Sequence, residues 1–270
     1  MKKSLLNAIA IAILGVLIAM VILHRHHPPR PVVPVTEKKE AINREYRNKI
    51  PRLWGEDIPG VLKRIRTTEK IVALTLDACG SPNDGYDKDL IDFLVREHVP
   101  ATLFINSRWI NKNPAVFQSL ASNPLFEIEN HGAEHKPASV NGKSVYGITG
   151  TGSPGELVDE IEINDRKIKE LTGRKPRFYR SGTAYYDEYA VEIVRRLGYR
   201  IAGFSLLGDA GASWSKEKIA VVVGAAQPGD IIICHMNHPE KETFEGLEKA
   251  LPRLKERGFS FVRLSDLPLQ

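Results

Sequence analysis

Apolar and polar residues follow two regular patterns along the chain after Lys70. Short runs of β-branched and aromatic residues predict strands, at 71–77, 101–106, 126–132, 177–181, 200–206, 230–236 and 260–265. Between them, apolar residues recur at helical spacing and predict helices at 87–98, 112–121, 154–172, 187–198, 215–224 and 241–257. Strands and helices that alternate this regularly are typical of parallel β/α units.

The predicted strands are apolar almost throughout, not only at every second residue. This pattern indicates a parallel sheet whose two faces are both buried. We therefore expect an α/β protein whose sheet is a closed or nearly closed barrel. A doubly wound open sheet is the alternative, because the sequence does not state the order of the strands.

The most hydrophobic stretch of the chain runs from Leu5 to Leu23 and follows two lysines. At about 1.5 Å per residue, a helix of this length spans a hydrocarbon layer of roughly 30 Å. We expect a transmembrane helix within residues 1–24 that anchors the chain in a membrane, with the remainder outside the cytoplasm, in the periplasm or at the cell surface. A cleaved signal peptide is the alternative, although its apolar region is usually shorter.

A linker is expected between this anchor and the folded domain. The proline-rich stretch PPRPVVP at 28–34 favours an extended spacer, and the charged residues 37–49 predict a solvated helix. We therefore place the linker at 25–64 and the folded domain at 65–270.

The net charge of +5 is concentrated near the N-terminus. Residues 1–50 hold nine of the 38 lysines and arginines but three of the 33 acidic residues, so the remainder of the chain is almost neutral. A basic stretch next to an anchor suits anionic lipid or surface polymer. A basic nucleic-acid groove inside the folded domain is not supported.

Side chains that can do chemistry gather at the C-terminal ends of the predicted strands. They are Asp77, His131, His135, Arg180, Asp209, His235 and His238. In β/α barrels this edge of the sheet carries the active site.

Two of these histidines, His131 and His135, are four residues apart in the stretch NHGAEH. On a helical turn, this spacing places both imidazoles on one side, close enough to share one metal ion. Imidazole ligands suit zinc, and also cobalt, nickel and iron. Zinc is the expected cofactor.

Four segments, TLDACG, NHGAEH, RFYRSG and IIICHMN, follow one another in this order. They resemble the motifs of the polysaccharide deacetylases of the NodB homology type, carbohydrate esterase family 4, from about residue 65 to the C-terminus. The resemblance implies a distorted (β/α) barrel of seven or eight strands. It also implies a metal-dependent hydrolase that removes acetyl groups, N-acetyl groups above all, from an envelope or extracellular polysaccharide of the peptidoglycan or exopolysaccharide type.

The resemblance further implies a role for individual residues. Asp77 matches the catalytic base of the family, and Arg180 matches the arginine that orients it. His131 and His135 match the two metal-binding histidines, and His235 matches the general acid. The stretch GFSLLGDAGASW stands at the fourth motif, so that Asp209 becomes the candidate partner of His235.

The first motif departs from the family pattern, because TFDDG is replaced by TLDAC and Ala78 stands where the metal-binding Asp is expected. Three accounts are open. Asp77 itself binds the metal; Asp84 or Asp87 supplies the missing carboxylate; or the thiolate of Cys79 completes a site with the two histidines. Alternation along a strand places Cys79 on the same face as Asp77, and zinc accepts a Cys–His–His set with one open position.

Cys79 also has two readings outside metal binding. A small thiol at a strand end is commonly buried without reacting. Cys234, the only other cysteine, could form a disulfide with Cys79 in an oxidising compartment if the distance allows it.

Asn130, Tyr146 and Tyr185 are the residues expected to bind substrate. Tyr146 lies in a connection, residues 136–156, that is unusually long between a strand and a helix. We expect this segment to form one wall of the substrate site, with Tyr146 stacking on a sugar ring. A flexible surface insert is the alternative.

Two other functions remain open. The loss of one metal-binding carboxylate is compatible with a catalytically inactive deacetylase-like barrel that binds surface glycan. Hydrolysis of a small amide outside carbohydrate chemistry is the other, because a fold does not fix its substrate.

Overall fold

The computed structural model describes residues 35–270, of which residues 39–270 form one compact unit. The hydrophobic segment at 5–23, and with it the predicted anchor, lies outside the described residues. Among the helices of residues 35–270, none has both the length and the apolar character needed to cross a membrane.

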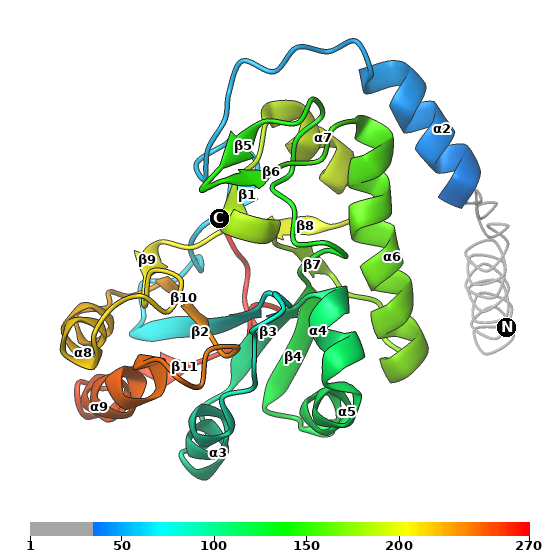
Figure 1. Ribbon diagram of the computed structural model, residues 1–270. Coiled ribbons are helices and arrows are strands. Elements are labelled where there is room, and N and C mark those ends of the chain that lie inside the picture. The colour runs from blue at the N-terminus through cyan, green and yellow to red at the C-terminus, as the bar shows by residue number, and fades with distance from the viewer. Residues whose placement is uncertain (1–34) are drawn as a thin grey trace, which may run out of the picture. The chain divides into compact units, whose positions relative to one another are not determined.

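Strands and helices alternate as the sequence pattern predicts, and Figure 1 labels them. The strands are β1 (Val61–Leu62), β2 (Ile71–Ala78), β3 (Ala101–Ile105), β4 (Phe126–Asn130), β5 (Ser144–Val145), β6 (Ile148–Thr149), β7 (Phe178–Tyr179), β8 (Arg200–Ala202), β9 (Leu206–Leu207), β10 (Ile231–His235) and β11 (Ser260–Phe261). The helices are α2 (Val35–Tyr46), α3 (Lys88–Arg96), α4 (Ser107–Lys112), α5 (Pro114–Ser122), α6 (Pro154–Thr172), α7 (Glu188–Arg196), α8 (Lys216–Gly224) and α9 (Thr243–Glu256).

The main sheet is parallel and follows the order β1-β8-β7-β4-β3-β2-β10-β9, with β11 added beside β2. From β2 to β8 the strand order follows the chain in one direction, and β10 returns to the other side of β2. Counted around the curled sheet from β2, the strands β3, β4, β7, β8, β9 and β10 follow the chain once around and lead back to β2, an arrangement that favours the barrel over the doubly wound alternative.

The sheet is a curled half-barrel around which the helices lie on the outside (Figure 1), consistent with the expected (β/α) barrel. Among the described strands, β1 and β9 are the two ends of the path and do not pair with each other. The short connection 203–205 passes across this opening: Gly203 donates to Leu62 of β1, and Ser205 donates to Ile231 of β10. The connection therefore links the two unpaired ends of the half-barrel.

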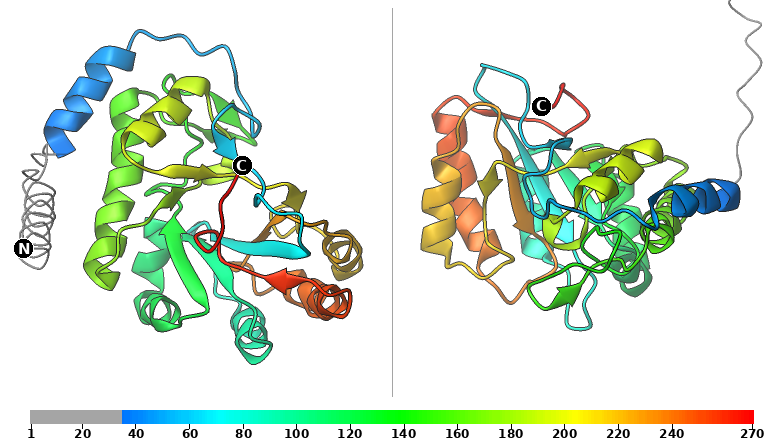
Figure 2. Two further views of the ribbon diagram at one scale, coloured as in Figure 1. Left: turned by 180° about the vertical axis from the view of Figure 1, so that it is seen from behind. Right: turned by 90° about the horizontal axis from the view of Figure 1, so that it is seen from above.

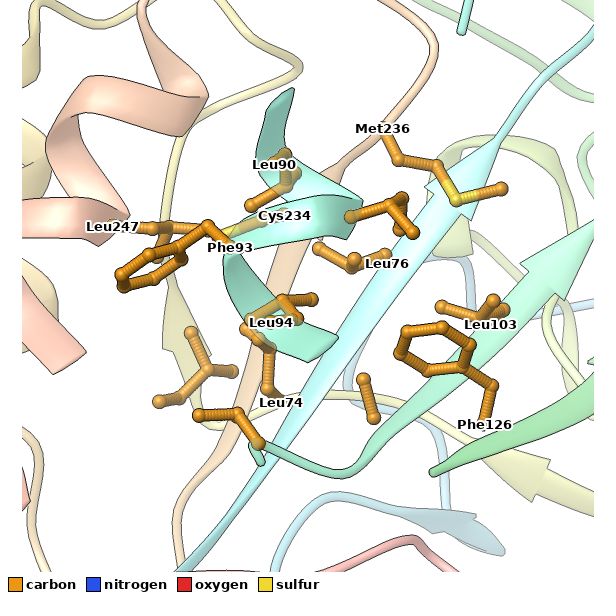
Figure 3. Close-up of a cluster of buried hydrophobic side chains, with 14 of the residues drawn as sticks. Leu74, Leu76, Leu90, Phe93, Leu94, Leu103, Phe126, Cys234, Met236 and Leu247 are labelled. Carbon is orange, nitrogen blue, oxygen red and sulfur yellow. The ribbon is translucent and has the colours of Figure 1, made fainter. Parts of the chain in front are cut away.

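Both faces of the central strands are buried, which explains their near-continuous apolar sequence. On the outer face, Leu74 and Leu76 of β2 pack against α3 and α9 in the cluster shown in Figure 3. On the inner face, Ala73 joins Phe104 and Phe178 in a second cluster below the carboxyl ends of the strands. A rigid base therefore supports the loops at that edge.

The ends of the long helices follow from local chemistry. The side chains of Asp87, Ser153, Asp187 and Ser215 accept a backbone N–H at the first turns of α3, α6, α7 and α8, as N-cap residues do. Gly173 ends α6 with a φ of 71°, a conformation that favours glycine. The predicted bounds of α6 are confirmed.

Residues 39–64, expected to belong to a linker, are part of the compact unit. The predicted helix is present as α2, but its Ile42 and Tyr46 are buried in a cluster with α6 and α7. β1 then pairs with β8 and extends the sheet. The boundary at residue 65 was wrong because the charged residues of α2 mask two apolar positions one turn apart, and because a two-residue strand has no recognisable period. Residues 39–64 are called the N-terminal segment below, and Figure 2 shows them and the sheet from behind and from above.

Candidate active site

The carboxyl ends of the strands meet at a cavity of about 510 Å³. Parallel register places Asp77 of β2 beside His235 of β10, and the loops after the other strands close around them. The residues that line the cavity are Glu56, Asp77, Cys79, Ser81, His135, Tyr146, Thr183, Ala184, Phe204, Leu207, Ala210, Gly211, Ile233, His235 and His238. The reactive residues expected at the strand ends are thus brought to one place.

Cys79, His131 and His135 converge so that one ligand atom from each lies within 4.8 Å of the other two. Among residues 35–270, they are the one group of three or more His, Cys, Asp or Glu side chains that meets this condition. Nε2 of His131 lies 3.8 Å from the sulfur of Cys79, and the two imidazole rings are 4.9 Å apart between centroids. Of the three accounts of the missing carboxylate, the geometry favours the thiol.

The orientation of His131 suits a metal ligand. Its Nδ1 lies 2.9 Å from the carbonyl oxygen of Arg180, to which it donates, and Nε2 is thereby left to face Cys79. A metal-binding histidine usually donates its other ring N–H in this way. The residues present therefore fit a divalent ion with soft and imidazole ligands, zinc above all.

The loop that carries His135 is not the helical turn that the spacing suggested. Residues 131–135 have no helical hydrogen bonding, and Gly132 and His135 have φ values of 76° and 60°. The buried carboxylate of Glu160 on α6 holds this loop, accepting the backbone N–H groups of Glu134 at 2.9 Å and Lys136 at 3.1 Å. The two imidazoles meet because Glu160 holds the loop in this shape. The i, i+4 spacing of the histidines does not reveal this contact.

Asp77 is held by a fully buried arginine. Nη1 of Arg180 donates to Oδ1 of Asp77 at 2.7 Å and to Oγ1 of Thr75 at 2.9 Å. The remaining donors of the guanidinium bond the backbone oxygens of Ala202 and Gly203. Oδ2 of Asp77 is left facing Nε2 of His131 at 3.6 Å.

His235 is paired with Asp209 in the same way. Nδ1 of His235 donates to Oδ1 of Asp209 at 2.9 Å, and the backbone N–H of His235 donates to Oδ2 at 2.7 Å. Burial opposes the charge of the imidazole, but the carboxylate of Asp209 outweighs it and raises the pKa of His235 well above its usual range. Burial likewise opposes the charge of Asp209, and His235 nevertheless lowers its pKa. The expected pairing of these two residues is present.

The two cysteines are free and lie on opposite faces of the sheet. Cys79 lines the cavity, as alternation from Asp77 predicts, whereas Cys234 packs among the apolar side chains of α3 and α9 (Figure 3). Burial raises the pKa of the Cys79 thiol, but the surrounding imidazoles, His135 first, hold it well below its usual range. Burial raises the pKa of the Cys234 thiol. The disulfide considered from the sequence is therefore absent.

Asp84 and Asp87, the other candidates for the missing carboxylate, serve elsewhere. Asp87 caps α3 by accepting the N–H of Leu90. Asp84 accepts the N–H of Ser81 and lies 3.8 Å from Nε2 of His238. Neither is part of the converging group.

The residues expected to bind substrate divide into two groups. Tyr146 is 73% exposed and lines the cavity from the turn of the β5–β6 hairpin, and Tyr185 contacts its ring. Of residues 136–156, Tyr146 is the one that lines the cavity. The expectation for Asn130 was wrong: it is fully buried, and its side chain bonds Ile161 and Gly132 on the helix side of β4.

The sequence model of the polysaccharide deacetylase family matches residues 64–202, just over half of the chain. The chain belongs to the polysaccharide deacetylase family. It is 25% identical over 208 residues to a peptidoglycan-N-acetylglucosamine deacetylase of Bacillus cereus, a match that covers 75% of this chain and 90% of that protein. The peptidoglycan-N-acetylmuramic acid deacetylase PdaA of Bacillus subtilis is 23% identical over 209 residues, covering 74% and 72% of the two chains.

Solved structures show the same fold. A family 4 carbohydrate esterase pseudoenzyme from Bacillus anthracis superposes with a TM-score of 0.64 at 21% identity, covering 77% of this chain and 69% of that one. Deacetylases of this family are hydrolases, and an inactive relative shares their fold.

Proposed function

We propose that this chain is a metal-dependent deacetylase that removes N-acetyl groups from a cell-envelope polysaccharide of the peptidoglycan type. The observation that carries the proposal is the convergence of Cys79, His131 and His135 on one cavity that also holds two supported acid–base side chains. Two relatives are named as peptidoglycan deacetylases, and the hydrophobic N-terminal segment supports a location outside the cytoplasm.

Cys79, His131 and His135 would hold one zinc ion and leave a position open to substrate and water. The ion would supply Lewis acidity toward the acetyl carbonyl and toward a water molecule. Cys79 takes the place of the carboxylate lost at Ala78, which leaves Asp77 free to act as a base.

Asp77 accepts the proton of the attacking water. Arg180 binds only Oδ1 of Asp77, so that Oδ2 remains available for this proton. His235 enters the reaction protonated because Asp209 stabilises its charge, and it gives the Nε2 proton to the leaving amine. A positioned acid of this kind contributes about 10²- to 10⁴-fold to the rate.

Metal binding and acetate release test the proposal together. The wild-type chain should bind one zinc ion and release acetate from peptidoglycan or N-acetylglucosamine oligomers. His131→Ala should lose both, whereas His235→Ala should retain the ion and lose turnover. His98→Asn is a matched control, because His98 is exposed away from the cavity and Asn tolerates its φ of 51°.

Cobalt substitution isolates the role of the thiol. Cobalt bound by a thiolate gives a sulfur-to-metal charge-transfer band, which Cys79→Ser should abolish while His235→Ala preserves it. A band that survives in Cys79→Ser would remove the thiol from the ligand set. A wild-type chain that binds neither zinc nor cobalt would contradict the metal site as a whole.

A catalytically inactive glycan-binding barrel is the second candidate. It is favoured by the replacement of the family's metal-binding Asp by Ala78 and by the likeness in fold to a pseudoenzyme. Binding of N-acetylglucosamine oligomers without acetate release, in the presence of zinc, would support it over the first.

A further inference from the structure

The segment before β1 runs beside the cavity, although it precedes the residues that the family model matches. Gly55 pairs antiparallel with Tyr186: the N–H of each donates to the carbonyl of the other, at 3.1 and 3.0 Å. In such a pair, side chains on either side of the paired residues share one face. Trp54 and Glu56 are therefore on the same face as Tyr185.

Three aromatic rings form a row on this face. The rings of Trp54 and Tyr185 lie 5.7 Å apart between centroids, and those of Tyr185 and Tyr146 also lie 5.7 Å apart. Tyr146 and Glu56 line the cavity that holds Asp77. The row thus extends into the cavity that holds the reactive residues.

The segment is fixed in place before any ligand arrives. The carboxylate of Glu188 accepts the backbone N–H groups of Arg52 at 2.7 Å and Leu53 at 3.0 Å. Ile58, on the other side of Trp54, is buried in the cluster with α6 and α7. A ligand that binds here does not have to order the segment, which lowers the entropy cost of binding.

We infer that Trp54, Glu56, Tyr146 and Tyr185 form a second sugar-binding subsite, for the ring next to the sugar that is deacetylated. The C–H face of a pyranose ring stacks on aromatic side chains, which offer a large apolar surface with a polar edge. Glu56 accepts hydrogen bonds from the hydroxyl groups of that ring. The inference rests on the proposed function, because it takes the occupant to be the neighbouring unit of the same glycan.

Charged side chains frame the subsite. Glu56 is the acid among the described residues beside the row of rings that also lines the cavity, and Nζ of Lys143 lies 5.9 Å from the centroid of the Trp54 ring. A carboxylate accepts and an ammonium donates hydrogen bonds, so that the pair suits the hydroxyl and acetamido groups of a hexosamine such as N-acetylglucosamine.

Chain-length dependence tests the subsite. The wild type should bind the N-acetylglucosamine tetramer more tightly than the monomer by calorimetry, and should deacetylate it with a higher kcat/KM. Trp54→Ala should raise the KM for the tetramer by about 2- to 10-fold, with the monomer unaffected, and Trp54→Phe should restore the wild-type value. Glu56→Gln should weaken tetramer binding less, because its amide oxygen still accepts a hydrogen bond.

Tyr189→Ala is the matched control. Tyr189 packs on Tyr46, and Lys49 lies over its ring, so that it supports the same N-terminal segment without lining the cavity. Its chain-length dependence should equal that of the wild type. Equal KM values for the tetramer in the wild type and a folded Trp54→Ala variant would overturn the subsite.

The two proposals can fail separately. If the wild type releases no acetate from any oligomer, the deacetylase function is contradicted, and calorimetry alone then tests the subsite. Tetramer binding that is lost in Trp54→Ala supports the subsite. Binding that is unchanged in Trp54→Ala, or a wild type that does not bind the tetramer, overturns it. An active wild type with the same efficiency on monomer and tetramer keeps the deacetylase and removes the subsite.

Discussion

Asp209 controls the protonation of the residue proposed as the general acid. It is fully buried and touches His235 through both carboxylate oxygens, and Thr243 donates to Oδ2 at 3.1 Å. A general acid works only while it is protonated, so activity should persist with rising pH until the raised pKa of His235 is passed.

Asp209→Asn should move the alkaline limb of the kcat/KM profile to lower pH, because the neutral amide no longer stabilises the imidazolium. The measurement is the pH dependence of acetate release from N-acetylglucosamine oligomers. Asp230→Asn is the control, since Asp230 is also buried but pairs with Arg64 away from the cavity. If the alkaline limb does not move in Asp209→Asn, Asp209 does not set the protonation of the general acid.

Single residues were predictable where their chemistry determined their place. Asp77, Arg180 and His235 stand at strand ends in recognisable motifs, and the structure brings Asp77 and His235 to one cavity, with the buried Arg180 bonded to Asp77. Asn130 was misjudged because it lies next to His131, whereas consecutive strand residues face opposite sides of a sheet. Glu56 escaped notice because an isolated acid in a charged segment carries no sequence signal.

At the scale of elements, α6 supports the proposed metal site from behind. Its Glu160 accepts two backbone N–H groups of the loop that carries His135, and a Cβ at Gly132 would lie 2.3 Å from Oε1 of Glu160. Helix and loop are therefore in close contact, and the position of His135 depends on the carboxylate.

Glu160→Ala should weaken zinc binding by about 10- to 100-fold, as loss of an outer support of a metal ligand commonly does. Glu160→Gln should lose less, because one oxygen still accepts from the loop. Zinc affinity by chelator competition is the measurement, with Asp159→Asn on the exposed side of the same helix as control. Unchanged affinity in a folded Glu160→Ala variant would show that the loop holds His135 by itself.

The long elements were predicted, and so were the short strands β7 and β11, but β1, β5 and β6 were not. Six helices and the long strands follow from apolar spacing over nine residues or more, or from continuous apolar runs. β1, β5 and β6 contain two residues each, too few to show any period. They are defined by pairing partners far along the chain, such as Ile201 for Val61.

At the scale of the whole chain, the folded unit begins before the residues that resemble the family. Ile42 is fully buried in the cluster with α6 and α7, whereas Ile50, eight residues later, is 79% exposed. The N-terminal segment therefore contributes to stability as well as to the wall of the cavity.

Ile42→Ala should lower the free energy of unfolding by about 2–5 kcal/mol, the usual result of truncating a buried isoleucine. Ile50→Ala should change it by less than about 0.5 kcal/mol. Urea unfolding of residues 39–270 and of both variants gives the comparison. Equal free energies of unfolding for the two variants would show that residues 39–64 are a linker and not part of the folded unit.

The two cysteines on opposite faces of the sheet provide a pair of internal reporters. Cys79 is 9% exposed and lines the cavity, and Cys234 is inaccessible among apolar side chains. A small thiol reagent should thus modify the protein in two separate phases: a fast one whose rate measures access to the cavity, and a slow one that proceeds only as fast as the sheet and helices separate. Occupation of the cavity should suppress the first phase and, by stabilising the folded state, slow the second as well.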